Sequence, residues 1–415
     1  MAACGLDFGT SNTTLGTLRS GRPALERLEG GAVTVPSAIF FPRAGEPAVG
    51  RAAIAAYVEG AQGRLMRGLK SVLGSSLLEE TTPVGRARIS FRAVIARYLA
   101  IVKERAEAEG RADLTRVVHG RPVHFVDGDP EGDRRAEAAL EEIARAVGFR
   151  EVSFQYEPIA AALDYESGID REEVALIADI GGGTSDFSVV RLSPERHARA
   201  DRAGDILSND GVRIGGTDFD RFLSLGGVMP LLGFGSPMKR PGLDVPSAYF
   251  HDLATWSSIN RLYDGRTLRE IQGLRREVAR PDLLERLATV IEMERGHTLA
   301  MAVEDAKIAL SGEGTARIDL GWVEPDLAAP LTRDDLERHT AEQARRIGAR
   351  IAACLAGAGL RDGALDALFL TGGSTRLPHV RAAILAAAPG ARVVEGDTFG
   401  SVGTGLTIEA ARRYG

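Results

Sequence analysis

The chain has 415 residues, of which 44% are hydrophobic and 26% are charged, and this composition suits a globular protein with a sizeable core and about two domains. The net charge of −6 weighs against a surface for nucleic acid or for anionic membranes. No apolar stretch approaches the ~20 residues of a membrane span. The first residues carry neither a basic region nor an apolar signal core, so we expect a cytoplasmic protein.

Cysteine and lysine are both scarce. The two cysteines, Cys4 and Cys354, lack the spacing of metal ligands, and we expect both to be buried. The 51 basic residues include only four lysines, which are Lys70, Lys103, Lys239 and Lys307. Lysine is a compact point charge, so a site that needs a small cation beside a phosphate resists replacement by arginine. For any one of these lysines, a solvated surface charge is the competing interpretation.

The first half of the chain alternates strand and helix patterns. Apolar runs predict strands within 1–20, 33–41 and 116–126, and helical periodicity predicts helices at 87–109 and 131–147. Gly148 is a natural end for the second of these helices. The alternation predicts an α/β fold.

The second half begins with a hairpin expected at 174–192. Residues 226–265 carry Gly and Pro clusters and Trp256, and we interpret them as an irregular insertion or small subdomain. A helical pattern resumes at 266–311. Thr332 with Asp335 predicts a capping box at the start of the next helix. A strand at 365–370, a helix after Pro378, a strand at 392–394 and a last helix from about Val402 complete the pattern.

Two short loops carry the candidate chemistry. Residues 7–14 read DFGTSNTT, residues 179–186 read DIGGGTSD, and each segment lies between two apolar runs. Glycine lets backbone N–H groups close on an anion, hydroxyls add donors, and an aspartate can hold a hydrated Mg²⁺. One such tip is an ordinary hairpin turn. One in each half of the chain indicates a duplicated fold that grips a polyphosphate from both sides.

Three further patterns are weaker. A strand runs into Gly-Gly-Ser at 372–374, where a flat ligand could lie close to the backbone, although a Gly pair in such a turn is also common for packing. The Gly pair at 215–216 enters a helix and could equally be an ordinary N-terminal cap. Glu304, Lys307 and Ser311 share one helical face, which alone favours an exposed ion-pair face.

Together these segments resemble the nucleotide-binding domain of the seventy-kilodalton heat-shock chaperones, in the actin–hexokinase superfamily. The matching segments are 4–14 and 179–188 for the phosphate loops, 35–37 for an early strand, 70–74 for a lysine motif, 156–165 and 398–410 for connector helices, 304–311 for the adenosine helix and 369–380 for the adenosine loop. Residues 120–125 look most like the short, YegD-type bacterial members. The resemblance implies an α/β actin-like ATPase fold, with duplicated ribonuclease H-like lobes around a central nucleotide cleft.

The resemblance also implies roles for individual residues. The catalytic residues would be Lys70, Asp7, Asp179, Glu157 and Thr184, and Asp7, Asp179 and Asp186 would hold Mg²⁺ through water. ATP or ADP would contact Gly9, Thr10, Ser11, Asn12, Gly181, Gly182, Gly183, Thr184, Gly215, Gly216, Glu304, Lys307, Ile308, Ser311, Gly372, Gly373, Ser374, Arg376 and Asp397. Within this set, Ile308 and Arg376 would sandwich the adenine. K⁺ is a further candidate ion.

The resemblance divides the chain into a first lobe at 1–175, a second lobe at 176–370 with the insertion at 226–265, and an adenosine loop with a C-terminal helix at 371–415. Pro122 matches the proline that relays nucleotide state in the family, whereas Pro130 stands where the family carries an arginine, which puts that relay in doubt. The family's acidic-leucine linker and substrate-binding domain do not follow in this sequence. We therefore expect a monomer that acts on a protein partner in trans, a co-chaperone or a client, without nucleic acid or membrane.

The leading expectation is a slow, Mg-dependent ATPase that acts as a nucleotide-controlled binding module. A metabolite kinase, a filament-forming actin relative and a pseudo-ATPase scaffold are the alternatives. The segments 156–165 and 304–311 favour the chaperone branch, and the intact acids with Lys70 weigh against a pseudo-ATPase. The candidate partner surface is the region 226–265. Its aromatic residues, Tyr249, Phe250, Trp256 and Tyr263, could equally pack a small subdomain.

Overall fold

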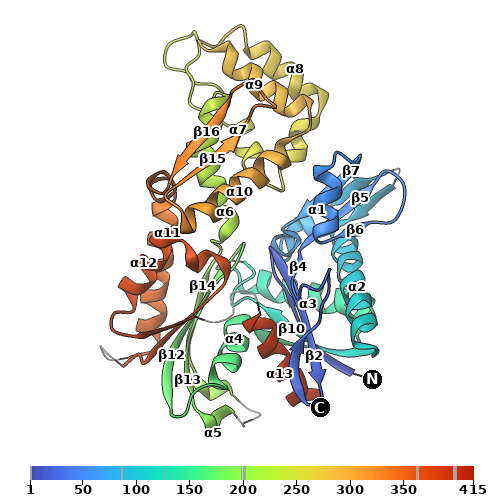
Figure 1. Ribbon diagram of the computed structural model, residues 1–415, viewed down its shortest axis with the longest axis vertical. Helices are drawn as coiled ribbons and strands as arrows, with labels where there is room; N and C mark the ends of the chain where they lie inside the picture. Colours follow the sequence, from blue (N-terminus) through green and yellow to red (C-terminus); the bar gives the residue numbers. More distant parts are fainter. Residues whose placement is uncertain are drawn as a thin grey trace. The chain divides into compact units, whose positions relative to one another are not determined.

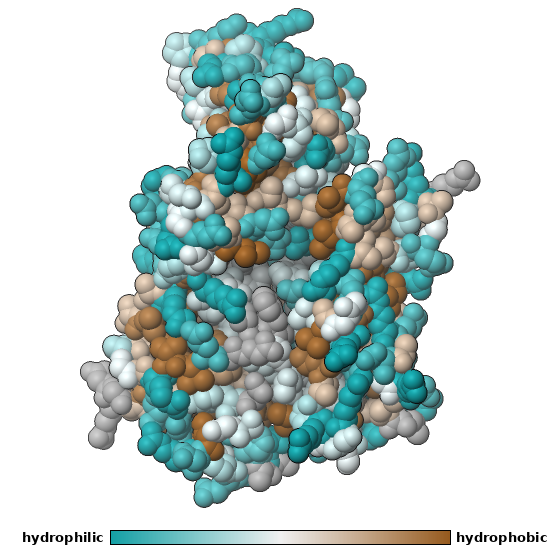
Figure 2. Space-filling model, viewed as in Figure 1, coloured by the Kyte–Doolittle hydropathy of each residue, from teal (hydrophilic) through white to brown (hydrophobic). Residues whose placement is uncertain are grey.

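The computed structural model describes residues 2–85, 87–126, 128–197, 199, 202–360, 364–395 and 400–415. The chain separates into two compact units. Unit 1 contains Met1–Gly215, Arg346–Thr375 and Val380–Gly415, and unit 2 contains Gly216–Arg345 and Arg376–His379. None of the described helices is long and apolar enough to cross a membrane. On the face drawn in Figure 2, hydrophobic side chains form separate groups among hydrophilic ones.

Unit 1 contains two large sheets (Figure 1). The first consists of β1 (Ala2–Phe8), β2 (Asn12–Arg19), β3 (Arg22–Leu25), β4 (Val35–Pro36), β10 (Leu114–Arg121) and β11 (Glu151–Tyr156). Its strand order is β11-β10-β1-β2-β3, with β4 paired to β2. Strands β1, β2 and β3 form an antiparallel meander, and β10 and β11 continue the sheet in parallel beside β1.

The second sheet repeats this arrangement. It consists of β12 (Glu173–Ile180), β13 (Ser185–Leu192), β14 (Ile206–Val212), β17 (Ala367–Thr371) and β18 (Arg392–Glu395). The strand order β14-β13-β12-β17-β18 is again an antiparallel meander followed by two parallel strands. Since the order and the strand directions match those of the first sheet, the duplicated fold predicted from the two loops is confirmed.

Smaller sheets and the helices complete unit 1. The small sheets contain β5 (Ala38–Pro42), β6 (Ala48–Val49) and β7 (Gly63–Arg67) in one case, and β8 (Thr81–Val84) and β9 (Ala87–Ser90) in the other. The helices are α1 (Arg51–Val58), α2 (Phe91–Gly110), α3 (Pro130–Ala146), α4 (Glu157–Glu166), α5 (Pro194–His197), the end of α11 (Arg333–Gly357), most of α12 (Pro378–Ala387), and α13 (Ser401–Tyr414).

Two element boundaries differ from those expected. Helix α2 begins four residues late, because residues 87–90 pair with β8 as a strand and Ser90 then caps the helix by accepting a hydrogen bond from the Ala93 N–H (3.2 Å). The strand expected at 116–126 ends at Arg121. The next residue is a proline, which lacks the N–H that would continue the ladder.

Helices α4 and α13 form the centre of unit 1. One core cluster joins these helices to strands of both sheets, and a second core cluster joins α2 and α3 to the first sheet. The two central helices lie side by side (Figure 1), and the contact is unusually close at Gly405. A Cβ atom at this position would lie 1.8 Å from the carbonyl oxygen of Ala160. Glycine at 405 is therefore what allows the helices to approach so closely.

Unit 2 is mainly helical. It contains α6 (Gly216–Leu223), α7 (Ala248–Leu253), α8 (Gly265–Leu274), α9 (Pro281–Glu292), α10 (Gly296–Gly312), the start of α11, and the two-stranded sheet of β15 (Thr315–Asp319) and β16 (Ala328–Thr332). The capping box at the start of α11 is confirmed, because the Thr332 N–H donates to Asp335 Oδ2 (3.0 Å) and the Asp335 N–H donates to Thr332 Oγ1 (3.1 Å).

The irregular region at 226–265 consists of short helical segments joined by turns. Within it, the side chain of Phe250 is fully buried. Trp256 is half-buried and packs edge-on against His297, with the ring centroids 4.7 Å apart. The Tyr263 hydroxyl accepts a hydrogen bond from the Gly296 N–H at 2.9 Å. Much of the aromatic surface of this region is thus used to pack unit 2.

Candidate functional site

The two loops are hairpin tips of the same length and the same geometry. In the first, the Gly9 N–H donates to the Asn12 carbonyl at 3.0 Å. In the second, the Gly181 N–H donates to the Thr184 carbonyl, also at 3.0 Å. The tips therefore occupy equivalent positions in the two copies of the fold.

The hairpins differ at one pair of equivalent positions. Across the first hairpin Asp7 faces Thr14, and across the second Asp179 faces Asp186. The second hairpin consequently carries two acids where the first carries one. The hydroxyl oxygen of Thr14 is buried and has no hydrogen-bond partner among the described residues.

The two tips touch each other through glycines. A Cβ atom on Gly182 would lie 2.1 Å from Ser11 Oγ, and one on Gly183 would lie 2.9 Å from Thr10 Oγ1. Gly215 closes the same region, because a Cβ there would lie 2.4 Å from the Gly183 nitrogen. Side chains at these positions would separate the tips, so the glycines keep backbone groups of both hairpins close together.

A buried ion pair lies beside the tips. Lys70 Nζ donates to Glu157 Oε1, and both residues are only 6% exposed. Glu157 is the first residue of α4, whereas Lys70 lies in a short 3₁₀ helix. Asp186 is also buried, accepts a hydrogen bond from the Val123 N–H at 2.7 Å, and is hydrogen-bonded by the side chain of Thr184.

The acids of this cluster repel one another. Burial raises the pKa of Asp7 and of Asp186 to about 7, and the negative charge of Glu157 adds to the rise in both. Burial and the neighbouring carboxylates also raise the pKa of Asp179. Burial alone would lower the pKa of Lys70, but Glu157 and Asp7 more than offset it, so the pKa is raised and the lysine remains a cation.

The cluster fits a hydrated divalent cation. Among the described residues, no three His, Cys, Asp or Glu side chains come together as a set of direct metal ligands. Mg²⁺ usually keeps several of its waters and takes its other oxygens from one or two carboxylates and from substrate phosphates. Asp7, Asp179 and Asp186 are crowded acids beside a turn of backbone N–H groups, so they match the donor set that such an ion needs.

Several contacts around the tips involve residues outside the predicted site. Ser37 Oγ donates to the Gly9 carbonyl at 2.6 Å and lies 2.9 Å from Thr13 Oγ1. Ser37 belongs to the early-strand motif at 35–37, and this motif could have marked it as a residue of the site. The role of Val123 could not have been recognised in the sequence, because it holds Asp186 through a backbone N–H, which every residue except proline offers.

The loop after β17 meets the second hairpin. Gly372 adopts a φ of +81°, and a Cβ there would lie 2.7 Å from Asp179 Oδ1. Ser374 Oγ donates to the Gly181 carbonyl at 3.3 Å. The structure thus brings part of the expected adenosine loop to the acid cluster, while Gly373 is exposed.

Most of the other predicted nucleotide contacts belong to unit 2. These are Gly216, Glu304, Lys307, Ile308, Ser311 and Arg376. There Lys307 Nζ lies 2.8 Å from Asp220 Oδ1 and donates to the Gly216 carbonyl at 3.1 Å. Ile308 is 58% exposed. Asp397 lies outside the described residues.

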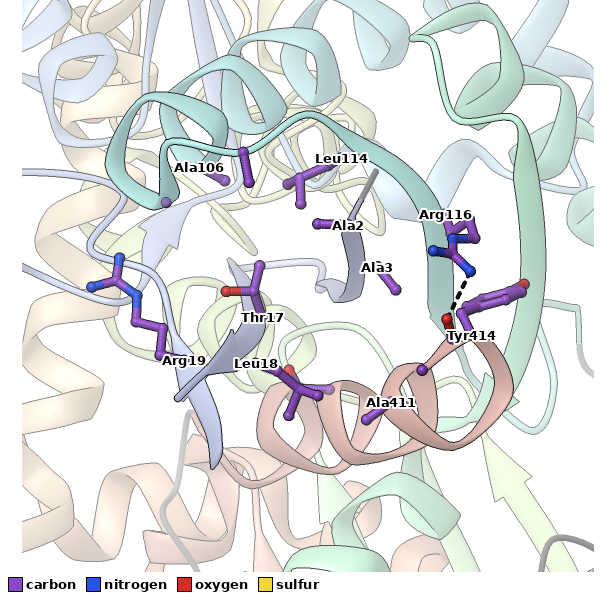
Figure 3. A pocket seen from close by; sticks show the side chains of 14 residues that line it. Ala2, Ala3, Thr17, Leu18, Arg19, Ala106, Leu114, Arg116, Ala411 and Tyr414 are labelled. Atoms are coloured by element: carbon purple, nitrogen blue, oxygen red, sulfur yellow. Dashed lines mark hydrogen bonds between the residues drawn. The ribbon is translucent and has the colours of Figure 1, made fainter. Parts of the chain in front are cut away.

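A separate cavity of about 390 Å³ opens at the other end of β1 (Figure 3). Its lining comprises Ala2, Ala3, Thr17, Leu18, Arg19, Ala106, Gly110, Ala112, Leu114, Arg116, Thr407, Ala411, Tyr414 and Gly415. The Arg116 side chain donates to the Tyr414 carbonyl at 2.7 Å beside it. The cavity starts where β1 starts, about 20 Å of strand from the hairpin tip, and does not belong to the candidate site.

Two sheets of one topology, joined by central helices and carrying equivalent glycine-rich tips beside buried acids, define the actin-like ATPase fold. A family model described as Hsp70 protein matches residues 3–224 and 291–397. The chain is 27% identical over 409 residues to the chaperone protein DnaK of Akkermansia muciniphila, and the alignment covers 91% of this chain and 53% of that protein. The chain belongs to the Hsp70 family, as its motifs predicted. It spans about half the length of this curated relative.

Proposed function

We propose that the protein binds ATP and ADP with Mg²⁺ at the paired hairpin tips and hydrolyses ATP slowly. The observation that carries the proposal is the contact between the two tips beside the Lys70–Glu157 ion pair and three further acids. Backbone N–H groups at glycine turns bind phosphate oxygens, and a lysine cation balances their charge. K⁺ is proposed as a further ion of the site.

The chemistry follows from positioning and charge. Phosphoryl transfer to water has little covalent chemistry for a protein to do, so the attacking water and the phosphate must be placed and their charge balanced. Lys70, held by Glu157, supplies the cation beside the γ-phosphate. Asp7 lies in the same acid cluster as Lys70 and Glu157, and we propose that it helps to activate the attacking water. Mg²⁺, when bound, neutralises charge on the phosphates.

Calorimetric titration tests nucleotide binding directly. Mg-ATP and Mg-ADP should both bind, and EDTA should weaken the binding of each. A ligand at ~100 times its dissociation constant should add ~2.7 kcal/mol to the free energy of unfolding. The absence of binding at millimolar nucleotide would contradict the proposal. Release of phosphate without any added acceptor would distinguish an ATPase from a metabolite kinase, which would make ADP only with its substrate present.

The cellular role is proposed from the relative, whose name describes a chaperone. Nucleotide state would control binding to a protein partner, a co-chaperone or a client, with the protein itself a monomer in the cytoplasm. We retain residues 226–265 as the candidate partner surface and the three ranges 1–175, 176–370 and 371–415 as the proposed domains. Replacing 236–258 by a short Gly/Ser loop should leave ATP turnover intact and abolish partner capture. Unchanged capture, or a variant that no longer folds, would show that the region is structural and that the partner surface lies elsewhere.

A further inference from the structure

Arg121 occupies an enclosed position at the end of strand β10. Its side chain is only 13% exposed. The guanidinium lies over two aromatic rings, 5.4 Å from the centroid of Phe125 and 4.9 Å from that of Tyr156. An ion pair with Glu137 of α3 holds it in place. Arginine suits such a position, because its planar group can stack on rings and donate hydrogen bonds in the same plane.

The first consequence concerns Asp186. Arg121 Nε donates to the Pro122 carbonyl at 3.1 Å, and one of its terminal nitrogens donates to the Val123 carbonyl at 3.4 Å. The turn that follows β10 is therefore closed over the guanidinium. The N–H of Val123 in this turn donates to Asp186 Oδ1 at 2.7 Å. The arginine thus fixes the peptide that holds one acid of the candidate site.

The second consequence concerns Lys70. Arg121 is paired with Tyr156 in the ladder between β10 and β11, and its guanidinium covers the Tyr156 ring. The next residue is Glu157, whose carboxylate binds Lys70. Gly120 gives the Glu157 side chain its room, since a Cβ there would lie 3.3 Å from Glu157 Cγ. The same arginine therefore contacts both the turn whose Val123 N–H holds Asp186 and the residue that precedes Glu157.

We propose that Arg121 is a positioning residue that sets the separation of Asp186 and the Lys70–Glu157 pair. The effect that we expect on kcat rests on the proposed ATPase function. The competing explanation is that Arg121 only ties α3 to the sheet through Glu137. The two explanations differ in a testable way, because a lysine can keep the ion pair with Glu137 but has no planar group to lay over the rings of Phe125 and Tyr156.

The test compares Arg121→Met and Arg121→Lys with the control Arg92→Met, which removes an arginine of α2 that is ion-paired to Glu79 and to Glu142 of α3. Arg121→Met should lower kcat for ATP about 10- to 100-fold, with KM and ADP affinity changed less than about threefold, because the charges are displaced and the glycine tips are not. Arg121→Lys should recover thermal stability without recovering kcat. The control should keep the parent kcat.

A second measurement separates this inference from the ATPase proposal. Hydrogen exchange at the Val123 amide, followed in protein without nucleotide, should be about tenfold faster in Arg121→Met than in the parent or in Arg92→Met. Unchanged exchange, or a kcat within twofold of the parent in folded Arg121→Met, would overturn the positioning role. Faster exchange in Arg121→Met, together with a parent that neither binds nor hydrolyses ATP, would support the positioning of Asp186 and contradict the ATPase proposal alone.

Discussion

Lys70 and Glu157 form a buried ion pair although 87 residues separate them in the chain. The lysine is the single cation placed among four carboxylates, those of Asp7, Glu157, Asp179 and Asp186, in the described part of the site. A buried charge that loses its partner is costly, so neither member of the pair can be removed without consequence. The pair therefore gives the sharpest test of the site.

Lys70→Ala should lower kcat for ATP by ~10²–10³, because the loss of one charge-stabilising contact to a transition state costs ~3–4 kcal/mol. ADP affinity should change little, since the proposed contact is to the γ-phosphate and the attacking water. Single-turnover hydrolysis and ADP titration measure the two quantities. A variant that hydrolyses ATP like the parent would show that Lys70 has been assigned wrongly.

Lys307→Ala should have the opposite pattern. This lysine lies in unit 2 between Asp220 and the Gly216 carbonyl, and its proposed role is to hold the nucleoside part of the ligand. Both ATP and ADP should bind about 10-fold more weakly, as expected when one charge-assisted hydrogen bond is lost, with kcat at saturation close to that of the parent. Equal affinities in variant and parent would remove Lys307 from the nucleotide site.

Gly405→Ala should destabilise the centre of unit 1. The new methyl group would lie 1.8 Å from the Ala160 carbonyl oxygen, so α4 and α13 would have to move apart. Overpacking of this kind lowers the free energy of unfolding by ~1–3 kcal/mol. Gly348→Ala on α11 is the matched control, because its Cβ would have no neighbour closer than 3.4 Å. Urea unfolding of both variants measures the difference, and equal midpoints would contradict the close contact.

His119 should make the protein sensitive to acid. The side chain is fully buried, and burial lowers its pKa from 6.5 to about 4. Below pH 6.5 the unfolded chain binds a proton that the folded chain does not, so the stability contributed by neutral His119 is lost as the pH falls from 6.5 towards 4. The loss should reach ~3 kcal/mol. His119→Leu should abolish this part of the pH dependence in urea unfolding between pH 7 and 4.5. An unchanged pH dependence would mean that His119 titrates normally.

Much of the fold was predictable, because the tips carry residues whose combination is uncommon. Glycines, hydroxyls and an acid between two apolar runs at 7–14 and 179–186 indicated equivalent hairpins, and the two sheets have the same strand order. The start of α2 was not predictable from periodicity, since the residues of β9 fit a helix pattern and adopt a strand only because β8 pairs with them.

The details of the site were less accessible to the sequence. Val123 contributes a backbone N–H, and no residue type marks that role. Arg121 is one of many arginines in this chain, and only the rings of Phe125 and Tyr156 distinguish it from a surface charge. In the sequence, Gly405 is an ordinary small residue of a helix, and only its contact with the neighbouring helix reveals its role. Each of these roles depends on which segment packs nearby.

The equivalence of the two hairpins bears on the direction in which a phosphate chain would lie between them. A cradle made of two identical tips would accept a phosphate chain equally well in either orientation. Here the position that is Thr14 in one hairpin is Asp186 in the other, so one side of the cradle carries an additional acid. A cation would be drawn to that side and the phosphate it binds would follow. Under the proposed function, the unequal pair of Thr14 and Asp186 adds to the other differences between the tips and would give the phosphate site a polarity.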